Sequence, residues 1–255
     1  MCEMKIAIMG DQGRIGKELL ALGCAPLRCN VLDHDETQAE IEKVKPDVII
    51  NCAGKSSVDW VCESNQNYKT AWKLAGRGTV NLQVKGVGLI SLSSEYIFNG
   101  KRGKYKENDK PNPINDYGII KLAMEALTVV WGGKVVRLSN CFGNDLHSVN
   151  NPPTFIFRSY AHRKHIAEGL LYIAQNYAKM PEVLNLAGTE VLSMYEFHLA
   201  AADVLGVDKK SIIPRKKEIP GFAPRPHKGG LNVSLARKLG VPLYSAHDGL
   251  KCLSR

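Results

Sequence analysis

The chain has 255 residues, of which 44% are hydrophobic and 23% charged, and its formal net charge is +9 at pH 7. This length and apolar fraction can bury a full core, as in one large α/β domain with a small appended lobe. No stretch reaches the roughly 18 successive apolar residues of a membrane helix, and the N-terminus lacks a signal-peptide pattern. We therefore expect a cytoplasmic protein that does not bind membranes.

The seven cysteines argue against a zinc protein, and the basic residues argue against a nucleic-acid-binding protein. The cysteines are odd in number and scattered, without the spacing of a zinc site, so we expect reduced thiols and no bound metal. Basic runs gather in the last fifty residues, at 209–210, 216–217 and 225–228. Because these runs are short and lack interleaved aromatic residues, they favour an anionic small substrate or simple solubility over nucleic acid.

The N-terminal segment carries the first motif. An apolar run at 4–9 is followed by Gly10, Gly13 and Gly16 and then by a helical pattern from residue 17. A strand, a three-glycine turn and a helix let backbone N–H groups approach a pyrophosphate at the helix N-terminus. The pattern predicts a dinucleotide site, and the alternative is a plain glycine-rich turn between strand and helix.

The second expected strand, at 25–28, bears on the choice of dinucleotide. A carboxylate at the end of this strand would bind the ribose 2′-hydroxyl of NAD, whereas an arginine suits a 2′-phosphate. Here the strand ends in Arg28. We therefore favour NADP(H) as the cofactor, with NAD(H) possible, and the alternative for Arg28 is a solvent-facing charge.

Strand and helix patterns alternate along the first 143 residues. Buried parallel strands are expected at 48–51, 87–92 and 135–138, and helices at 37–44, 66–84 and 117–130. This alternation predicts an α/β fold with a Rossmann-type, doubly wound parallel sheet, whose ligands lie at the carboxyl ends of the strands. The glycine turn, the small-residue loop 53–55 and Ser93-Ser94 all fall at such ends.

A tyrosine and a lysine are spaced by one helical turn downstream. Tyr117 and Lys121 lie at i and i+4, so both face the same side of a helix, and the ammonium group is expected to lower the pKa of the phenol. Tyr117 would then exchange a proton with a substrate oxygen that a serine hydroxyl at 93 or 94 holds. The alternative is a surface helix with a solvated lysine.

These motifs together resemble a known enzyme family. SSEYIFNG at 93–100, the following Pro111-Asn-Pro113, and Tyr117-Gly118 with Lys121 are similar to the extended short-chain dehydrogenase/reductases, within them most closely to the dTDP-4-dehydrorhamnose reductases. PDVIINCAG at 46–54, VVRLSNCFG at 135–143 and NLAGTEVLSMYEF at 185–197 fit the same family. The similarity spans nearly the whole chain.

The resemblance implies a role for each matching residue. Ser94 would hold the carbonyl oxygen, Tyr117 would donate the proton, and Lys121 would bind the nicotinamide ribose. Hydride would pass to C4 of a nucleotide-activated 4-keto-6-deoxy sugar. The implied cofactor-binding residues are Gly10, Gly13, Arg14, Ile15 and Gly16 at the pyrophosphate, Asp33 at the adenine, and Cys52, Ala53 and Gly54 beside the nicotinamide.

One departure from the family and two alternative functions stay open. The segment 143–162 is shorter than the corresponding segment of the family. It lacks most of a helix and loop that close over the substrate in the family. We expect a dinucleotide-binding domain over 1–143, joined by parts of 160–180, and a substrate lobe over 144–255, and a homodimer is an open expectation. The alternatives are a nucleotide-sugar epimerase or dehydratase, and a non-catalytic NADP-binding subunit like the regulatory subunit of methionine adenosyltransferase.

Overall fold

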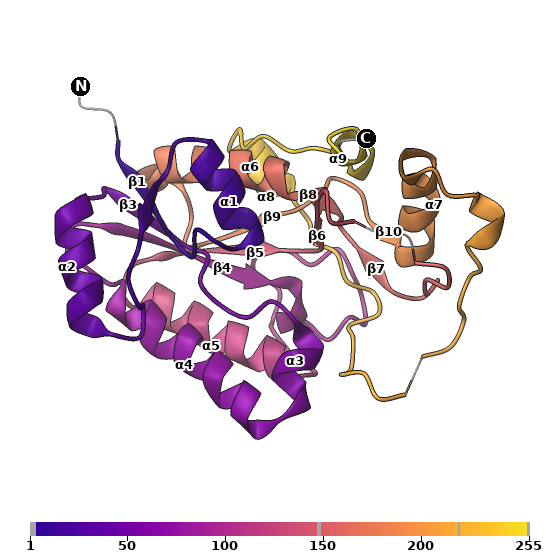
Figure 1. Ribbon diagram of the computed structural model, residues 1–255, viewed down its shortest axis with the longest axis horizontal. Coiled ribbons are helices and arrows are strands. Elements are labelled where there is room, and N and C mark those ends of the chain that lie inside the picture. Colours follow the sequence, from indigo (N-terminus) through magenta and orange to yellow (C-terminus); the bar gives the residue numbers. More distant parts are fainter. Residues whose placement is uncertain (1–3, 147–148, 219, 254–255) are drawn as a thin grey trace.

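A twisted sheet of six parallel strands forms the centre of the molecule (Figure 1). The computed structural model describes residues 4–146, 149–218 and 220–253. The strand order is β2-β1-β3-β4-β5-β9. The bounds are β1 Ile6–Met9, β2 Ala25–Leu27, β3 Val48–Asn51, β4 Gly88–Ser94, β5 Lys134–Leu138 and β9 Val183–Leu186. The predicted α/β fold with a doubly wound parallel sheet is confirmed.

Helices cover both faces of this sheet (Figure 1). The helices α1 (Arg14–Ala21) and α6 (Arg163–Gln175) pack together on one face, and α4 (Asn65–Asn81) and α5 (Asp116–Val130) pack on the other. The remaining helices of the first 130 residues are α2 His34–Val44, α3 Val58–Glu63 and the 3-10 turn η1 Glu95–Ile97. A sheet covered on both faces needs apolar side chains on both, which explains the continuous apolar runs of its strands.

The strands send alternate side chains into two separate cores. Ile8 and Ile50 are fully buried against α1 and α6, whereas Ala7 and Ile49 are buried in the core on the opposite face. This alternation follows from the two-residue repeat of an extended strand. The order in which strands are added to the sheet reverses at β1, because β2 lies on one side of it and β3 on the other. At such a switch point a crevice opens at the carboxyl ends of β1 and β3.

Two predicted helices have different bounds in the structure. The helix expected from residue 37 begins at His34, because Asp33 caps it: its Oδ1 accepts a hydrogen bond of 3.0 Å from the Glu36 N–H. The helix expected to reach residue 84 ends at Asn81. The buried side chain of Asn81 donates to the Val31 carbonyl at 2.8 Å, so a tertiary contact decides this end.

The C-terminal part builds a smaller layer beside the carboxyl edge of the sheet (Figure 1). Its core contains Phe142, Tyr160 and Phe197, and the Tyr160 and Phe197 rings stack at 4.0 Å between centroids. The elements after β5 are β6 Cys141–Phe142, β7 Phe157–Arg158, β8 Ala161–His162, η2 Tyr177–Lys179, β10 Leu192–Ser193, α7 Met194–Leu205, η3 Lys209–Ser211, α8 Ser234–Lys238 and α9 Ala246–Leu250. The domain division at residue 143 stays a prediction. Within the described ranges, each helix is too short or too polar to cross a membrane.

A buried ion pair joins the two layers. Arg158 of β7 places its Nε 2.8 Å from Oε1 of Glu95 in η1, and the two side chains are only 3% and 1% exposed. The Gly230 N–H donates to the same carboxylate. Because Glu95 directly follows Ser94, the pair fixes the C-terminal layer against the end of β4.

We expect Arg158→Met to lower the free energy of unfolding by about 3 to 5 kcal/mol, because it leaves the Glu95 carboxylate buried without its cation. Urea denaturation followed by circular dichroism measures this change. Lys209→Met is the control, because the Lys209–Asp203 pair is exposed and its loss should cost less than about 1 kcal/mol. Equal losses in the two variants would contradict the prediction.

Candidate active site

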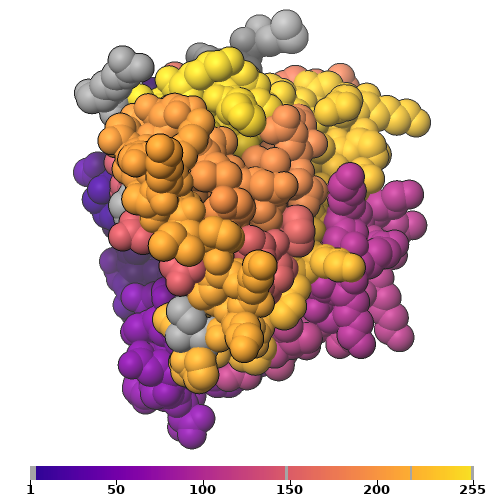
Figure 2. Space-filling model, turned by 90° about the vertical axis from the view of Figure 1, so that its right-hand side faces the viewer, coloured from indigo at the N-terminus to yellow at the C-terminus, as the bar shows by residue number. Residues whose placement is uncertain are grey.

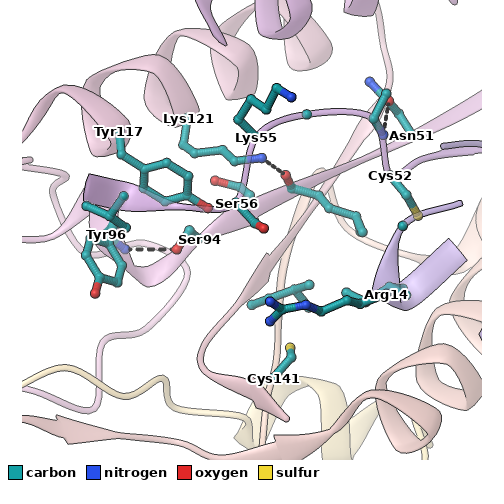
Figure 3. A pocket seen from close by; sticks show the side chains of 18 of the residues that line it. Arg14, Asn51, Cys52, Lys55, Ser56, Ser94, Tyr96, Tyr117, Lys121 and Cys141 are labelled. Carbon is teal, nitrogen blue, oxygen red and sulfur yellow. Dashed lines mark hydrogen bonds between the residues drawn. The ribbon is translucent and has the colours of Figure 1, made fainter. Parts of the chain in front are cut away.

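A pocket of about 340 Å³ opens at the carboxyl ends of β1, β3, β4 and β5 (Figure 3). It is lined by Gly13, Arg14, Ile15, Gly16, Asn51, Cys52, Ala53, Gly54, Lys55, Ser56, Val58, Leu92, Ser93, Ser94, Tyr96, Tyr117, Lys121, Leu138, Ser139, Asn140 and Cys141. Most of the residues expected at the site therefore meet in one cavity. Their individual roles stay predictions.

The glycine turn between β1 and α1 forms one wall. A Cβ on Gly16 would lie 2.2 Å from the Gly10 carbonyl oxygen, and one on Gly10 would lie 2.9 Å from the Ala53 nitrogen. Gly10 also has a φ of +92°, which favours glycine. Gly13 is the N-cap of α1 and offers no side-chain cap, so the first N–H groups of the helix face the pocket region. This turn fits the pyrophosphate of a dinucleotide.

The loop after β3 forms the neighbouring wall. Asn51, the last residue of β3, accepts a hydrogen bond of 3.1 Å from the Ala53 N–H and donates to Thr79 at 3.4 Å. These bonds shape the loop that carries Cys52, Ala53 and Gly54. The sequence analysis missed Asn51, although a buried polar residue at the end of a strand is a usable signal.

Ser94, Tyr117 and Lys121 converge on the opposite side (Figure 3). Ser94 ends β4, and its Oγ accepts a hydrogen bond of 3.3 Å from the Tyr96 N–H. Tyr117 lies in the first turn of α5 and is 8% exposed. Lys121 follows one turn later and donates to the Leu92 carbonyl at 2.8 Å. A hydroxyl, a phenol and an ammonium group therefore share one pocket.

The start of α5 determines where the tyrosine lies. Asn115 caps the helix by accepting a hydrogen bond of 2.9 Å from the Gly118 N–H. A Cβ on Gly118 would lie 2.2 Å from the Tyr96 carbonyl oxygen, so only glycine lets α5 approach η1 this closely. This contact brings the Tyr117 ring beside the Tyr96 ring, edge to face at 5.6 Å.

The pKa values of the pair differ from the expectation. Burial raises the pKa of the Tyr117 phenol above its ordinary value, and a hydrogen bond with Ser94 opposes the shift only in part. Burial lowers the pKa of Lys121 to about 8. The prediction that Lys121 lowers the pKa of Tyr117 is wrong for this arrangement, because the ammonium bonds the main chain and lies 5.9 Å from the phenol ring centroid.

Three expected cofactor residues do not line the cavity. Gly10 supports it from behind, since its carbonyl accepts the Gly13 N–H at 3.1 Å. Asp33 caps α2, as described above. Arg28 directly follows β2, and its Nε lies 3.8 Å from Oδ2 of Asp11 in the glycine turn. The adenine role of Asp33 and the 2′-phosphate role of Arg28 stay predictions.

Other lining residues were not anticipated from the sequence. Ser139, Asn140 and Cys141 follow β5, and the rule that ligands lie at the carboxyl ends of strands would have found them. Tyr96 comes from η1, where nothing in the sequence indicates that the ring lines a cavity. Lys55, which belongs to the expected loop 53–55, also lines the cavity, with its Nζ 5.1 Å from the Trp60 ring centroid.

The shortened segment packs toward the glycine turn. The described residues of 143–162 contain only the strands β7 and β8, and no helix. The Asp145 carboxylate lies 3.0 Å from Nη1 of Arg163 and 3.4 Å from Nε of Arg14. The segment thus contacts the glycine-turn side of the pocket. Nowhere in the described ranges do three or more His, Cys, Asp or Glu residues gather to hold a metal ion.

Comparison with known proteins identifies the family. A family model described as the RmlD substrate binding domain matches residues 4–166. The chain belongs to this family. The match covers both the glycine turn and the Ser94, Tyr117 and Lys121 set, and it confirms the expected resemblance to the dTDP-4-dehydrorhamnose reductases.

Individual relatives carry two different names. Methionine adenosyltransferase 2 subunit beta from Xenopus tropicalis is 27% identical over 251 residues, which cover 86% of this chain and 75% of that protein. A dTDP-4-dehydrorhamnose reductase from Aggregatibacter actinomycetemcomitans is 32% identical over 143 residues, or 53% of this chain and 46% of that protein. The crystal structure of dTDP-4-dehydrorhamnose reductase from Bacillus anthracis in complex with NADP superposes with a TM-score of 0.85, at 21% identity and 98% coverage of both chains. This RmlD-type chain therefore has the reductase fold.

Proposed function

We propose that this protein is an NAD(P)H-dependent reductase of a nucleotide-activated 4-keto-6-deoxy sugar. The observation that carries the proposal is the convergence of Ser94, Tyr117 and Lys121 in one pocket with the glycine turn. A pocket built only to hold a dinucleotide would need the turn but not a buried proton donor opposite it. Membership in the RmlD family and the reductase fold support the same reaction class.

The chain's own groups suit the reductive direction. The Ser94 hydroxyl would donate a hydrogen bond to the carbonyl oxygen of the sugar. The Tyr117 phenol, whose raised pKa keeps it protonated at neutral pH, would donate its proton to that oxygen. The Lys121 ammonium would hold the ribose beside the nicotinamide. A bound nicotinamide supplies the hydride, and the pocket supplies orientation and charge.

NADP(H) is the proposed cofactor. Arg28 directly follows β2 and is 72% exposed, which leaves its guanidinium accessible to a 2′-phosphate. The neighbouring Asp11 carboxylate would repel such a phosphate, so its contact with Arg28 makes NAD(H) the alternative. The ratio of kcat/KM values for NADPH and NADH decides between them, and Arg28→Ala should lower only the value for NADPH.

Purified protein mixed with NADPH or NADH and a dTDP-4-keto-6-deoxy sugar tests the proposal through the absorbance of the reduced cofactor. Oxidation that requires both the sugar and Tyr117 supports it. Absence of oxidation with every 4-keto-6-deoxy sugar nucleotide would overturn it.

The pH profile of kcat/KM should follow the titration of the Lys121 ammonium group. Its ammonium loses a proton as the pH rises through about 8, so we expect kcat/KM to fall above that pH. A lysine pKa that is lower in the folded state than in the unfolded state also opposes folding below about pH 8, and this penalty is relieved as the pH rises further. Lys121→Met should abolish the fall near pH 8 together with most of the activity, whereas Lys69→Met should change neither. A wild-type profile that is flat to pH 9 would contradict the assignment.

A second candidate is a non-catalytic dinucleotide-binding subunit, favoured by the similarity to methionine adenosyltransferase 2 subunit beta over 86% of this chain. Such a protein would show a higher melting temperature with NADP but no turnover. Formation of a stable complex with a methionine adenosyltransferase, together with no turnover of any sugar nucleotide, would favour this candidate.

A nucleotide-sugar epimerase or dehydratase is the third candidate. It would retain its dinucleotide through the cycle and convert the sugar without net consumption of NAD(P)H. Tyr96 occupies the position in SSEYIF where some epimerising relatives carry a cysteine, which favours the reductase. Mass analysis of the sugar product separates the two reactions.

A further inference from the structure

Two segments far apart in the sequence hold the whole net charge of the chain. Residues 100–112 carry a formal charge of +3 and residues 209–228 carry +6, and the rest of the chain sums to zero. In the sequence these look like scattered basic runs. A protein that needed positive charge only for solubility would have no reason to gather it in two segments.

The fold places these segments side by side (Figure 2). The Lys228 N–H donates to the Gly100 carbonyl at 2.8 Å, and the Lys104 N–H donates to the Gly229 carbonyl at 3.4 Å. A contact of 2.5 Å between Nε2 of His227 and Oε1 of Glu218 brings the 216–217 stretch to the same place. In Figure 2 the yellow-orange part of the chain borders the magenta part on the right-hand side of the view.

Seven of the nine exposed lysines of these segments, those in 101–110 and 216–228, are called the lysine face. Its members are Lys101, Lys104, Lys106, Lys110, Lys216, Lys217 and Lys228. The neighbouring acidic side chains are already taken, because Asp109 pairs with Arg102 and Glu218 pairs with His227. Seven ammonium groups thus face the solvent without a carboxylate partner in the described part of the chain.

Large apolar side chains are exposed on the same strap. Ile213 is 63% exposed and Phe222 is 61% exposed, and Phe222 follows Pro220-Gly221 in an irregular segment. Two such residues among lysines are unusual for a solvated loop. They are typical of a surface that inserts apolar groups below a layer of negative charge.

We infer that the lysine face and Phe222 dock the protein on an anionic lipid surface. Lysines near such a surface each strengthen binding about fivefold, and they act as mobile point charges that suit diffuse headgroups. Nucleic acid fits less well, because Arg102 and Arg225 are already paired with Asp109 and Asp59, and among the described residues of the two segments Phe222 is the one large exposed aromatic residue. A protein partner also fits less well, since lysine is depleted in protein interfaces. This inference departs from the sequence-based expectation of no membrane binding and does not depend on the proposed reaction.

Sedimentation of the full-length protein with phosphatidylcholine vesicles, with or without about one-third phosphatidylglycerol, tests the inference. We expect binding only to the anionic vesicles, and loss of most of it when salt is raised from about 0.1 to about 0.5 M. Lys101→Gln, Lys104→Gln and Lys228→Gln combined should weaken binding about a hundredfold. The matched control combines Lys69→Gln, Lys73→Gln and Lys238→Gln, which remove the same charge from exposed positions outside the face and should leave binding within about threefold of wild type.

Phe222→Ser distinguishes lipid from other polyanions. It should weaken vesicle binding about tenfold, because the phenyl ring no longer enters the bilayer interface. Equal weakening by the two triple variants, or no binding of wild type to anionic vesicles at low salt, would overturn the inference. Duplex DNA or single-stranded RNA that binds more tightly than the vesicles, with no effect of Phe222→Ser, would overturn it in favour of nucleic acid.

Discussion

Tyr117→Phe should lower kcat for reduction of the 4-keto sugar about a thousandfold, because general acid catalysis by a positioned group contributes roughly that factor. The variant keeps the ring that packs with Val58, Val61 and Ile120, so the pocket should keep its shape. Only the phenolic hydroxyl is lost. Stopped-flow or steady-state absorbance of NADPH measures the change, and a thermal shift with NADP shows that the variant still binds the dinucleotide.

Tyr96→Phe is the matched control for this prediction. The same hydroxyl is removed from a ring that lines the same pocket and lies edge to face on Tyr117. Its hydroxyl accepts only a long bond of 3.4 Å from Arg158, so we expect a loss of less than about tenfold. Equal activity of Tyr117→Phe and wild type would remove Tyr117 from the mechanism and leave the proposed reaction without a proton donor.

Gly16→Val should abolish dinucleotide binding and destabilise the protein. A Cβ at residue 16 would lie 2.2 Å from the Gly10 carbonyl oxygen and 2.9 Å from the Asp11 Cα, and both are backbone atoms that cannot rotate away. The turn would have to open, which moves the N–H groups at the start of α1. We expect the Kd for NADP to rise at least about a hundredfold, as when charge-assisted hydrogen bonds to a ligand are lost. Calorimetric titration measures this Kd.

Gly76→Ala separates this effect from the general cost of replacing glycine. Gly76 lies inside α4, and a Cβ there would meet nothing within 4 Å. Alanine should therefore stabilise the helix by about 1 kcal/mol and leave the Kd unchanged. Unaltered NADP binding by Gly16→Val would show that the glycine turn does not hold the pyrophosphate, whatever the fate of the reductase proposal.

Much of the nucleotide-binding layer could be predicted because its signals are local. The alternation of β1, β3, β4 and β5 with helices is visible in apolar runs, and the glycine spacing is visible in ten residues of sequence. The element ends were less predictable. Asn81 ends α4 because its side chain bonds the loop after β2, a partner fifty positions away.

The candidate site was predictable only in outline. Ser94, Tyr117 and Lys121 could be named from their spacing and from family resemblance, and the structure does bring them into one pocket. The titration of the pair was not predictable. Whether a lysine lowers the pKa of a tyrosine depends on how much water both have lost, and here burial raises the pKa of Tyr117 while the Ser94 hydrogen bond opposes the shift only in part.

The sequence alone determined the fold class, the position of the glycine turn and the identity of the polar groups at the strand ends. These features follow from strand and turn preferences, which act over a few neighbouring residues. Only the tertiary structure decided which of these groups share a cavity, which way their pKa values move, and that two remote basic segments form one surface. These properties arise from burial and from contacts between distant residues, and neither is contained in any short stretch of the chain.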